Sequence, residues 1–219
     1  MQKIKTEFTC RVEHAQKYCA LLDFLENGPS LQPPTIYNNN NSLCITQDLF
    51  KILKSNTFII IYNIVESTVY NCITKIRDSI EFDSLGYKDS SKKIQELWTK
   101  CCSQKKIKDI IDKIAKNAPI TLPENTINIS GSIDIKKIND VIDAYGIYGH
   151  LSKSTHTANS FLKIKNRRNN LAHGEKNYTT ASQDITLKEI HTMLYEIEEY
   201  LKDFLNNVET YLVEKKYKA

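Results

Sequence analysis

The sequence predicts an all-α protein that folds as a helical bundle. Its 219 residues include only 6 Gly and 5 Pro, and so few turn-forming residues favour long helices over many short strands. Over several stretches the apolar residues recur every three or four positions, which is the pattern of amphipathic helices. The fractions of hydrophobic residues (41%) and charged residues (26%) are those of an ordinary globular protein that buries a core.

Two long amphipathic helices are expected in the N-terminal part of the chain. The first covers residues 7–26, and a loop rich in Pro and Asn follows at 28–42. The second covers about 46–81. Their inward positions are expected to be Val12, Ala15, Cys19, Leu22 and Leu25 in the first helix, and Phe58, Ile61, Val65, Val69, Cys72, Ile76 and Ile80 in the second.

Further helices are expected in the rest of the chain. A third helix over 91–117 begins at Ser90 or Ser91 and ends before Pro119. Residues 120–133 carry turn-forming and β-branched residues, and we expect a short hairpin there at most. The remaining helices are expected at 134–145, with Gly146 after its end, at 158–173, with Gly174 after its end, and at 186–215. No internal repeat and no second domain is evident, so we expect one helical domain over residues 1–219.

Positive charge is unevenly distributed along the chain, although the net charge is only +4. Residues 88–116 carry nine Lys against four acidic residues, a net +5. Residues 161–177 carry five cationic residues against Glu175, a net +4. Such a run forms either a solvated helix face or a surface that attracts phosphate groups, and the sequence leaves both readings open.

The cysteines and the apolar segments of the sequence indicate in which cellular compartment the protein is expected. The six cysteines include no CxxC pair and no Cys and His grouping with zinc spacing. The N-terminal residues are polar, unlike a signal peptide, and the longest apolar run, residues 58–62, is too short to span a membrane. We therefore expect a cytoplasmic protein with free thiols, no membrane partner, no metal site and no cofactor.

Two adjacent arginines stand near the end of the helix expected at 158–173. The chain has 26 Lys and only 4 Arg, yet Arg167 and Arg168 are neighbours, and Asn169 and His173 follow them. A His in the last helical turn lies where the helix dipole favours a protonated ring. A cationic residue before a final Gly is also a common way to end a helix, so the pattern alone is degenerate.

Arg168 occupies an unusual position for a charged residue. It shares one face of the predicted helix with three apolar residues, Phe161, Ile164 and Leu171. Arg is rarely buried unless it has a partner. Arg168 is therefore expected either to pair with an acidic residue inside the bundle or to point into a seam where a second chain packs. His173 lies about 140° further around the helix, so two such helices related by a twofold axis bring the Arg and His side chains together more readily than one does.

The stretch RNNLAHG, residues 168–174, resembles the R-x4–6-H motif of the HEPN superfamily, in which a polar residue follows the Arg. The preceding segment INISGSIDIKKINDVIDAYGI (127–147) and the long final helix resemble the MAE_28990/MAE_18760-like branch of these proteins. The resemblance is good over about 120–219, looser over NIVESTVYNCI (63–73), and slight over residues 1–45.

The resemblance implies a metal-independent endoribonuclease whose active site lies at the interface of a homodimer. His173 is then the general base or acid, Arg168 binds the phosphate and stabilises the transition state, and Asn169 orients His173 or the phosphate. The products are a 2′,3′-cyclic phosphate and a 5′-hydroxyl, and DNA is not cleaved. A role as a toxin or in phage defence, checked by a partner protein, goes with this reading.

Other residues have supporting roles in this interpretation. Glu66 pairs with Arg168 across the bundle or faces solvent, and Arg167 binds the RNA backbone or stays in water. The further residues expected to contact RNA are Lys163, Lys165 and Lys176. An alternative function is a non-catalytic HEPN dimer that binds RNA or docks a protein, which has no need of Arg168, Asn169 and His173 together.

Overall fold

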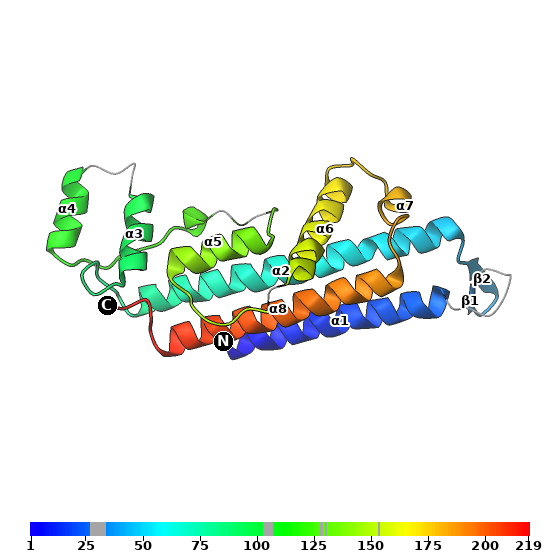
Figure 1. Cartoon of the computed structure of the whole chain (residues 1–219), viewed down its shortest axis with the longest axis horizontal. Coiled ribbons are helices and arrows are strands. Elements are labelled where there is room, and N and C mark those ends of the chain that lie inside the picture. Colours follow the sequence, from blue (N-terminus) through cyan, green and yellow to red (C-terminus); the bar gives the residue numbers. More distant parts are fainter. Residues whose placement is uncertain (27–33, 103–106, 128, 130, 153) are drawn as a thin grey trace. The chain divides into compact units, whose positions relative to one another are not determined.

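The computed structural model describes residues 1–26, 34–102, 107–127, 129, 131–152 and 154–219. About 70% of the residues so described are helical, so the predicted all-α fold is confirmed (Figure 1). The helices are α1 (Gln2–Glu26), α2 (Gln47–Phe82), α3 (Lys92–Cys101), α4 (Ile107–Ala115), α5 (Ile135–Tyr145), α6 (Thr155–Ala172), α7 (Tyr178–Ala181) and α8 (Leu187–Val213). Among them, no helix is both long and apolar enough to cross a membrane.

The chain divides into two compact units. Unit 1 comprises Met1–Lys5, Glu66–Ser152 and Tyr200–Ala219, and unit 2 comprises Thr6–Val65 and Lys153–Glu199. Helices α1, α2 and α8 therefore contribute residues to both units. The expectation of one domain over residues 1–219 stays a prediction.

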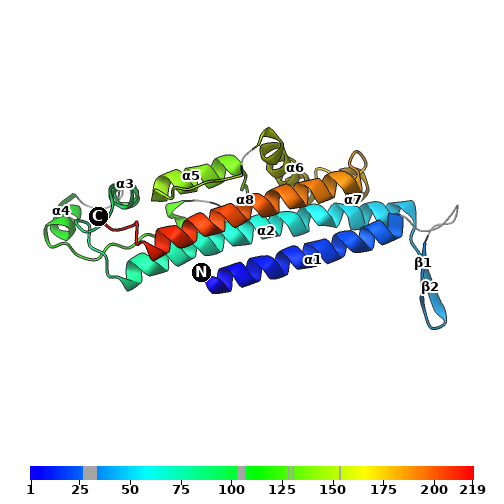
Figure 2. The same ribbon diagram turned by 60° about the horizontal axis from the view of Figure 1, so that its bottom comes forward.

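Unit 2 is built on segments of α1, α2 and α8 that lie side by side in both views (Figures 1 and 2). The inward positions predicted for α1 are all buried, and Phe8 extends their stripe by one turn. In α2 the predicted stripe is also buried along its whole length. Apolar periodicity was therefore sufficient to orient both helices, because each long helix has a single face that can be removed from water.

Unit 1 contains the remaining part of α2, the C-terminal part of α8, and α3, α4 and α5. Asp134 caps the start of α5 by accepting a hydrogen bond from the Lys137 N–H at 3.0 Å. Gly146 ends this helix in the left-handed conformation with a φ of 71°, as the sequence predicted. The buried residues of α5, which also contacts α3, are Ile138, Val141 and Tyr145.

The C-terminal residues of unit 1 are held by one carboxylate. Asp83 receives the ammonium groups of Lys215 and Lys218 at 2.9 and 2.7 Å and the Tyr217 hydroxyl at 3.0 Å. These hydrogen bonds, led by that from Lys218, hold the pKa of Asp83 well below its usual range. The tail that follows α8 is therefore fixed against the end of α2.

One predicted helix is wrong in extent. The helix expected at 91–117 is two helices, α3 and α4, and residues 103–106 between them lie outside the described part. The buried face of α3 includes Leu97. If α3 continued as one helix through residue 108, Lys108 would lie on this same buried face, because it is 11 residues, about three turns, after Leu97. A break before α4 avoids burying that charge, and α4 itself buries none of its residues.

The hairpin also lies elsewhere than predicted. Strand β1 (Thr35–Asn38) pairs antiparallel with β2 (Asn41–Cys44). The hairpin begins within residues 28–42, which were expected to be a loop, and ends two residues beyond them. The two-residue connection places Asn39 at a φ of 52°, a conformation that Asn tolerates better than most residues. Where the hairpin was expected, the structure describes the short 3₁₀ helix η1 (Glu124–Thr126).

Candidate functional site

The candidate site is at the C-terminal end of α6, in unit 2. The helix begins where the Ser154 hydroxyl accepts a hydrogen bond from the Thr157 N–H at 3.0 Å. Phe161 and Ile164 are each only 1% exposed, and Leu171 is also buried. The burial of these three residues confirms the predicted inward face of α6. It also sets the rotation of the helix about its axis, and so the direction in which each side chain of the last turn points.

Arg168 lies on this same face and is half-buried. Its guanidinium carbon is 4.4 Å from the ring centre of Tyr62, a residue of α2 whose side chain is buried. Its Nη1 donates to Asn169 Oδ1 at 3.1 Å. Stacking on an aromatic face compensates in part for removing a cation from water. The contact with Tyr62 was not foreseen from the sequence, and it explains how a charged residue is accommodated within an apolar stripe.

His173 is the residue directly after α6 and is exposed to solvent. Its backbone N–H donates to the carbonyl of Asn169 at 2.9 Å, which closes the last helical turn. Gly174 follows with a φ of 71°, as the sequence predicted. The imidazole is therefore presented from a defined backbone position and is open to a ligand.

The turn after the helix is held by Asn170. With its amide oriented to suit its neighbours, its nitrogen donates to the Glu175 carboxylate at 2.9 Å and to the Asn166 carbonyl at 3.2 Å. The Asn170 carbonyl accepts from the Lys176 N–H at 3.2 Å. Asn170 was not singled out from the sequence, yet it connects the last turn of α6 to the residues that follow His173.

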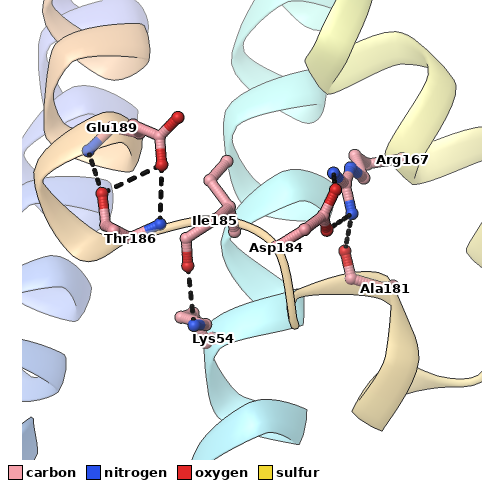
Figure 3. Close-up of polar contacts among 7 residues, drawn as sticks. All are labelled: Lys54, Arg167, Ala181, Asp184, Ile185, Thr186 and Glu189. Atoms are coloured by element: carbon pink, nitrogen blue, oxygen red, sulfur yellow. Dashed lines mark hydrogen bonds and ion pairs between the residues drawn. The ribbon is translucent and has the colours of Figure 1, made fainter.

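Arg167, the neighbour of Arg168 in α6, has its own protein partners. Its guanidinium makes two hydrogen bonds to the Asp184 carboxylate, at 2.7 and 2.6 Å, and a third to the Ala181 carbonyl (Figure 3). It also lies 5.7 Å from the ring centre of Phe58. The bond from Arg167 is the main cause that lowers the pKa of Asp184 to about 2.

The segment that receives Arg167 leads directly into α8. Thr186 and Glu189 form a reciprocal cap, with the Thr186 N–H donating to Glu189 at 2.8 Å and the Glu189 N–H donating to Thr186 Oγ1 at 3.2 Å (Figure 3). The bond from the Thr186 N–H holds the pKa of Glu189 below its usual range. Arg167 therefore connects α6 to the capped N-terminal end of α8.

The other residues proposed from the sequence lie at various places. Lys163 and Lys176 are exposed, and Lys165 is half-buried, so contact of each with RNA stays a prediction. Glu66 belongs to unit 1, where its carboxylate accepts from the Gly131 N–H at 2.8 Å. Its pairing with Arg168 also stays a prediction.

Besides Asn170, sequence reasoning missed Tyr62 and Asp184. Tyr62 follows Ile61 of the predicted stripe in α2, so its burial was within reach, but no pattern in one chain pairs it with Arg168. Asp184 lies 17 positions after Arg167, and no helix or strand periodicity predicts a contact between residues so separated. Only the turn between α7 and α8 brings its carboxylate to α6.

The all-α fold of the chain agrees with the helical fold of the HEPN family. A sequence model of the MAE_28990-like HEPN family matches residues 1–217, and the chain belongs to this family. The match includes residues 1–45, over which the sequence resemblance was slight, and residues 63–73, over which it was looser. HEPN domains are generally nucleases or RNA-related proteins, and they commonly form dimers. No curated protein and no solved structure matches the chain significantly.

Proposed function

We propose that this protein is an endoribonuclease that cleaves RNA without a metal ion, with Arg168, Asn169 and His173 as its catalytic residues. The observation that carries the proposal is the arrangement at the end of α6. Arg168 lies over the ring of Tyr62 and donates to Asn169, and His173 is exposed at the position directly after the helix. A positioned cation and an accessible imidazole that meet at one phosphate are suited to phosphoryl transfer.

The proposed reaction uses the substrate's own hydroxyl group as the nucleophile. His173 accepts the proton of a ribose 2′-hydroxyl, whose oxygen attacks the adjacent phosphorus atom. The bond from phosphorus to the 5′-oxygen of the next nucleotide breaks, and that oxygen receives a proton. The products are a 2′,3′-cyclic phosphate and a 5′-hydroxyl, and DNA, which lacks the 2′-hydroxyl, does not react.

Arg168 binds the phosphate in this scheme. Its planar guanidinium offers several parallel N–H donors, which match the oxygens of a phosphate that gains negative charge in the transition state. Asn169 holds the Arg168 guanidinium through its side-chain oxygen, and its backbone carbonyl binds the His173 N–H. Asn169 thus connects the two residues that carry the chemistry.

The active site is proposed to form in a homodimer, with α6 of each protomer facing the other. Arg168 and His173 point to different sides of a single helix, so a cleft shared by two helices allows both to reach one phosphate. A nuclease of this kind is harmful to its own cell, which suits a toxin or phage-defence protein held in check by a partner protein.

The test is cleavage of a labelled single-stranded RNA by the purified protein in EDTA, with DNA of the same sequence alongside. We expect RNA cleavage with a cyclic phosphate terminus and no cleavage of DNA. His173→Ala and Arg168→Ala should each lower the rate on the order of 10²–10⁴-fold. Arg168→Lys should also be impaired, because an ammonium cannot replace a bidentate guanidinium.

The control is His156→Ala, which removes an exposed His from the first turn of the same helix. This variant should cleave as wild type does. If His173→Ala cleaves RNA as fast as wild type, the nuclease proposal is wrong. Undiminished RNA binding without cleavage by the wild-type protein favours the alternative function of a non-catalytic RNA-binding or docking dimer.

A further inference from the structure

A cavity of about 440 Å³ lies in unit 2, away from the motif residues. This volume is within the range of small-molecule sites in proteins. Its walls come from the end of α1, the residues on either side of the hairpin, the first turns of α2, and the segment between α7 and α8. The described residues that line it are Leu25, Glu26, Pro34, Ile45, Gln47, Phe50, Lys51, Lys54 and Gln183.

Lys54 is a buried cation in the wall of this cavity. Its residue is only 9% exposed, and its ammonium donates one hydrogen bond, to the Ile185 carbonyl at 2.8 Å (Figure 3). The ring centre of Phe50 lies 5.9 Å from the nitrogen. An ammonium has three donors, and within the described part of the chain no carboxylate lies within ion-pair distance of Lys54.

Such a group is costly to bury without an anionic partner. Burial lowers the pKa of Lys54, so the folded protein already bears part of this cost. An open volume beside an ammonium with unused hydrogen-bond donors is the setting in which an anion gains most from binding. The hydrogen bond to Ile185 fixes the position of the ammonium, so the site is formed before the anion arrives.

The other lining residues define the anion. Lys51 already lies 3.8 Å from Asp48, on the same helix. Glu26 adds a negative charge, so the two lysines and Glu26 leave the lining with a net charge of +1. A ligand with one negative charge is therefore neutralised by the lining of the cavity, whereas a second negative charge on the ligand is repelled by Glu26. The apolar lining residues, which suit a hydrocarbon body, are Leu25, Pro34, Ile45 and Phe50.

We infer that this cavity binds a small monocarboxylic acid with an apolar chain or ring. The carboxylate accepts hydrogen bonds from the Lys54 ammonium, and the hydrocarbon body contacts Phe50 and its apolar neighbours. Gln47 and Gln183 are exposed at the rim of the cavity and border the entrance. The inference does not depend on the proposed RNA cleavage, because none of the lining residues belongs to the Arg168–Asn169–His173 motif.

The test is isothermal titration of the full chain with octanoate and 4-phenylbutyrate, each compared with its neutral amide. The wild-type protein should bind both acids at least about tenfold more tightly than the amides, because only the acids make a charge-assisted hydrogen bond with Lys54. Phenyl phosphate, with its second negative charge, should bind more weakly than 4-phenylbutyrate. These comparisons use the wild-type protein alone, so they do not depend on how any variant folds.

A matched pair of variants then locates the site. Lys54→Met should weaken binding of both acids at least about tenfold and leave the amides unaffected. Lys17→Met, which removes an exposed Lys from α1 and changes the net charge equally, should bind as wild type does. The inference is overturned if neither acid binds, if the amides bind as tightly as the acids, or if Lys54→Met retains full affinity. Tighter binding of phenyl phosphate than of the acid overturns the assignment to a monocarboxylate.

Discussion

The guanidinium of Arg168 lies over the ring of Tyr62, with 4.4 Å between the guanidinium carbon and the ring centre. Tyr62 is only 1% exposed, so the ring is held by the core of unit 2. A cation placed over an aromatic face is attracted by the ring. The contact therefore helps to hold the Arg168 cation in place at the end of α6.

The first prediction follows from this contact. Tyr62→Phe keeps an aromatic face under Arg168 and should retain most of the RNA cleavage activity. Tyr62→Leu removes the face and should lower the cleavage rate by about 2- to 30-fold, which corresponds to a cation–π contribution of about 0.5–2 kcal/mol. Initial rates at saturating RNA measure this effect.

Thermal unfolding shows whether Tyr62→Leu lowers the cleavage rate by removing the aromatic ring under Arg168 or by unfolding the protein. Tyr62→Leu also alters a packed core and should cost on the order of 1–3 kcal/mol of stability. The rates must therefore be compared at a temperature where both variants are fully folded by circular dichroism. Equal rates for Phe and Leu at position 62 contradict a positioning role for the ring.

The second prediction concerns Arg167 and Asp184. If Arg167 is a structural residue, Asp184→Asn weakens the support of the end of α6 and lowers both thermal stability and the cleavage rate modestly. If Arg167 instead binds RNA, removing its carboxylate partner raises RNA affinity. Fluorescence anisotropy with labelled RNA distinguishes the two outcomes, and we expect no gain in affinity.

The same pair has a defined pH dependence. The pKa of Asp184 is about 2 in the folded protein and 3.8 ordinarily. The folded state thus favours the ionised carboxylate, and the resulting stability is present above pH 3.8 and is lost as the pH falls toward 2. The difference in melting temperature between wild type and Asp184→Asn should therefore be constant near neutral pH and should shrink below about pH 4. A difference that persists unchanged to pH 2 contradicts the ion pair.

Most of the fold could be predicted because it depends on local periodicity. The stripes of α1, α2 and α8 recur over many turns, and Gly146 and Gly174 end their helices as expected. The break between α3 and α4 was missed because each part is amphipathic on its own. The hairpin was misplaced because strands of four residues carry too little pattern to be distinguished from a loop.

The candidate site could be predicted only in part. The motif residues are close in sequence, so one helix was enough to propose Arg168, Asn169 and His173. The partners that position them come from distant parts of the chain, Tyr62 from α2 and Asp184 from the turn before α8. Tertiary contacts of this kind leave no periodic trace in a single sequence.

The third prediction concerns the buried ammonium of Lys54. Burial lowers its pKa from the ordinary value of 10.5, and repulsion by Lys51 lowers it further. Attraction to the carboxylates of Glu26, Asp184 and Glu189 raises the pKa, but by less than burial lowers it. Below the lowered pKa the folded protein holds a costly buried charge, and Lys54→Met should therefore raise the melting temperature at pH 7. Stability of the wild type relative to the variant rises with pH, because the folded state loses its proton before the unfolded state does.

The expected gain from Lys54→Met is thus largest near neutral pH and disappears as the pH approaches 10.5. Thermal unfolding of both proteins at several values between pH 7 and 10 measures it, with Lys17→Met as the control for net charge. A gain that does not change with pH shows that packing of the methionine, and not the buried charge, is responsible. A loss of stability at pH 7 contradicts the cost assigned to this ammonium.

The last prediction concerns the proposed homodimer. Leu162 of α6 is 45% exposed, and it shares a helix face with His173 because the two lie 11 residues, about three turns, apart. A dimer that covers His173 with a second α6 also covers Leu162, so Leu162→Glu should place two buried carboxylates at the interface. We expect this variant to be monomeric at micromolar concentration by light scattering and to lose RNA cleavage, with the melting temperature of the protomer little changed. Leu21→Glu is the matched control, since Leu21 is 43% exposed but lies on α1, and it should remain dimeric and active. A wild-type protein that is monomeric at micromolar concentration and still cleaves RNA excludes the shared active site.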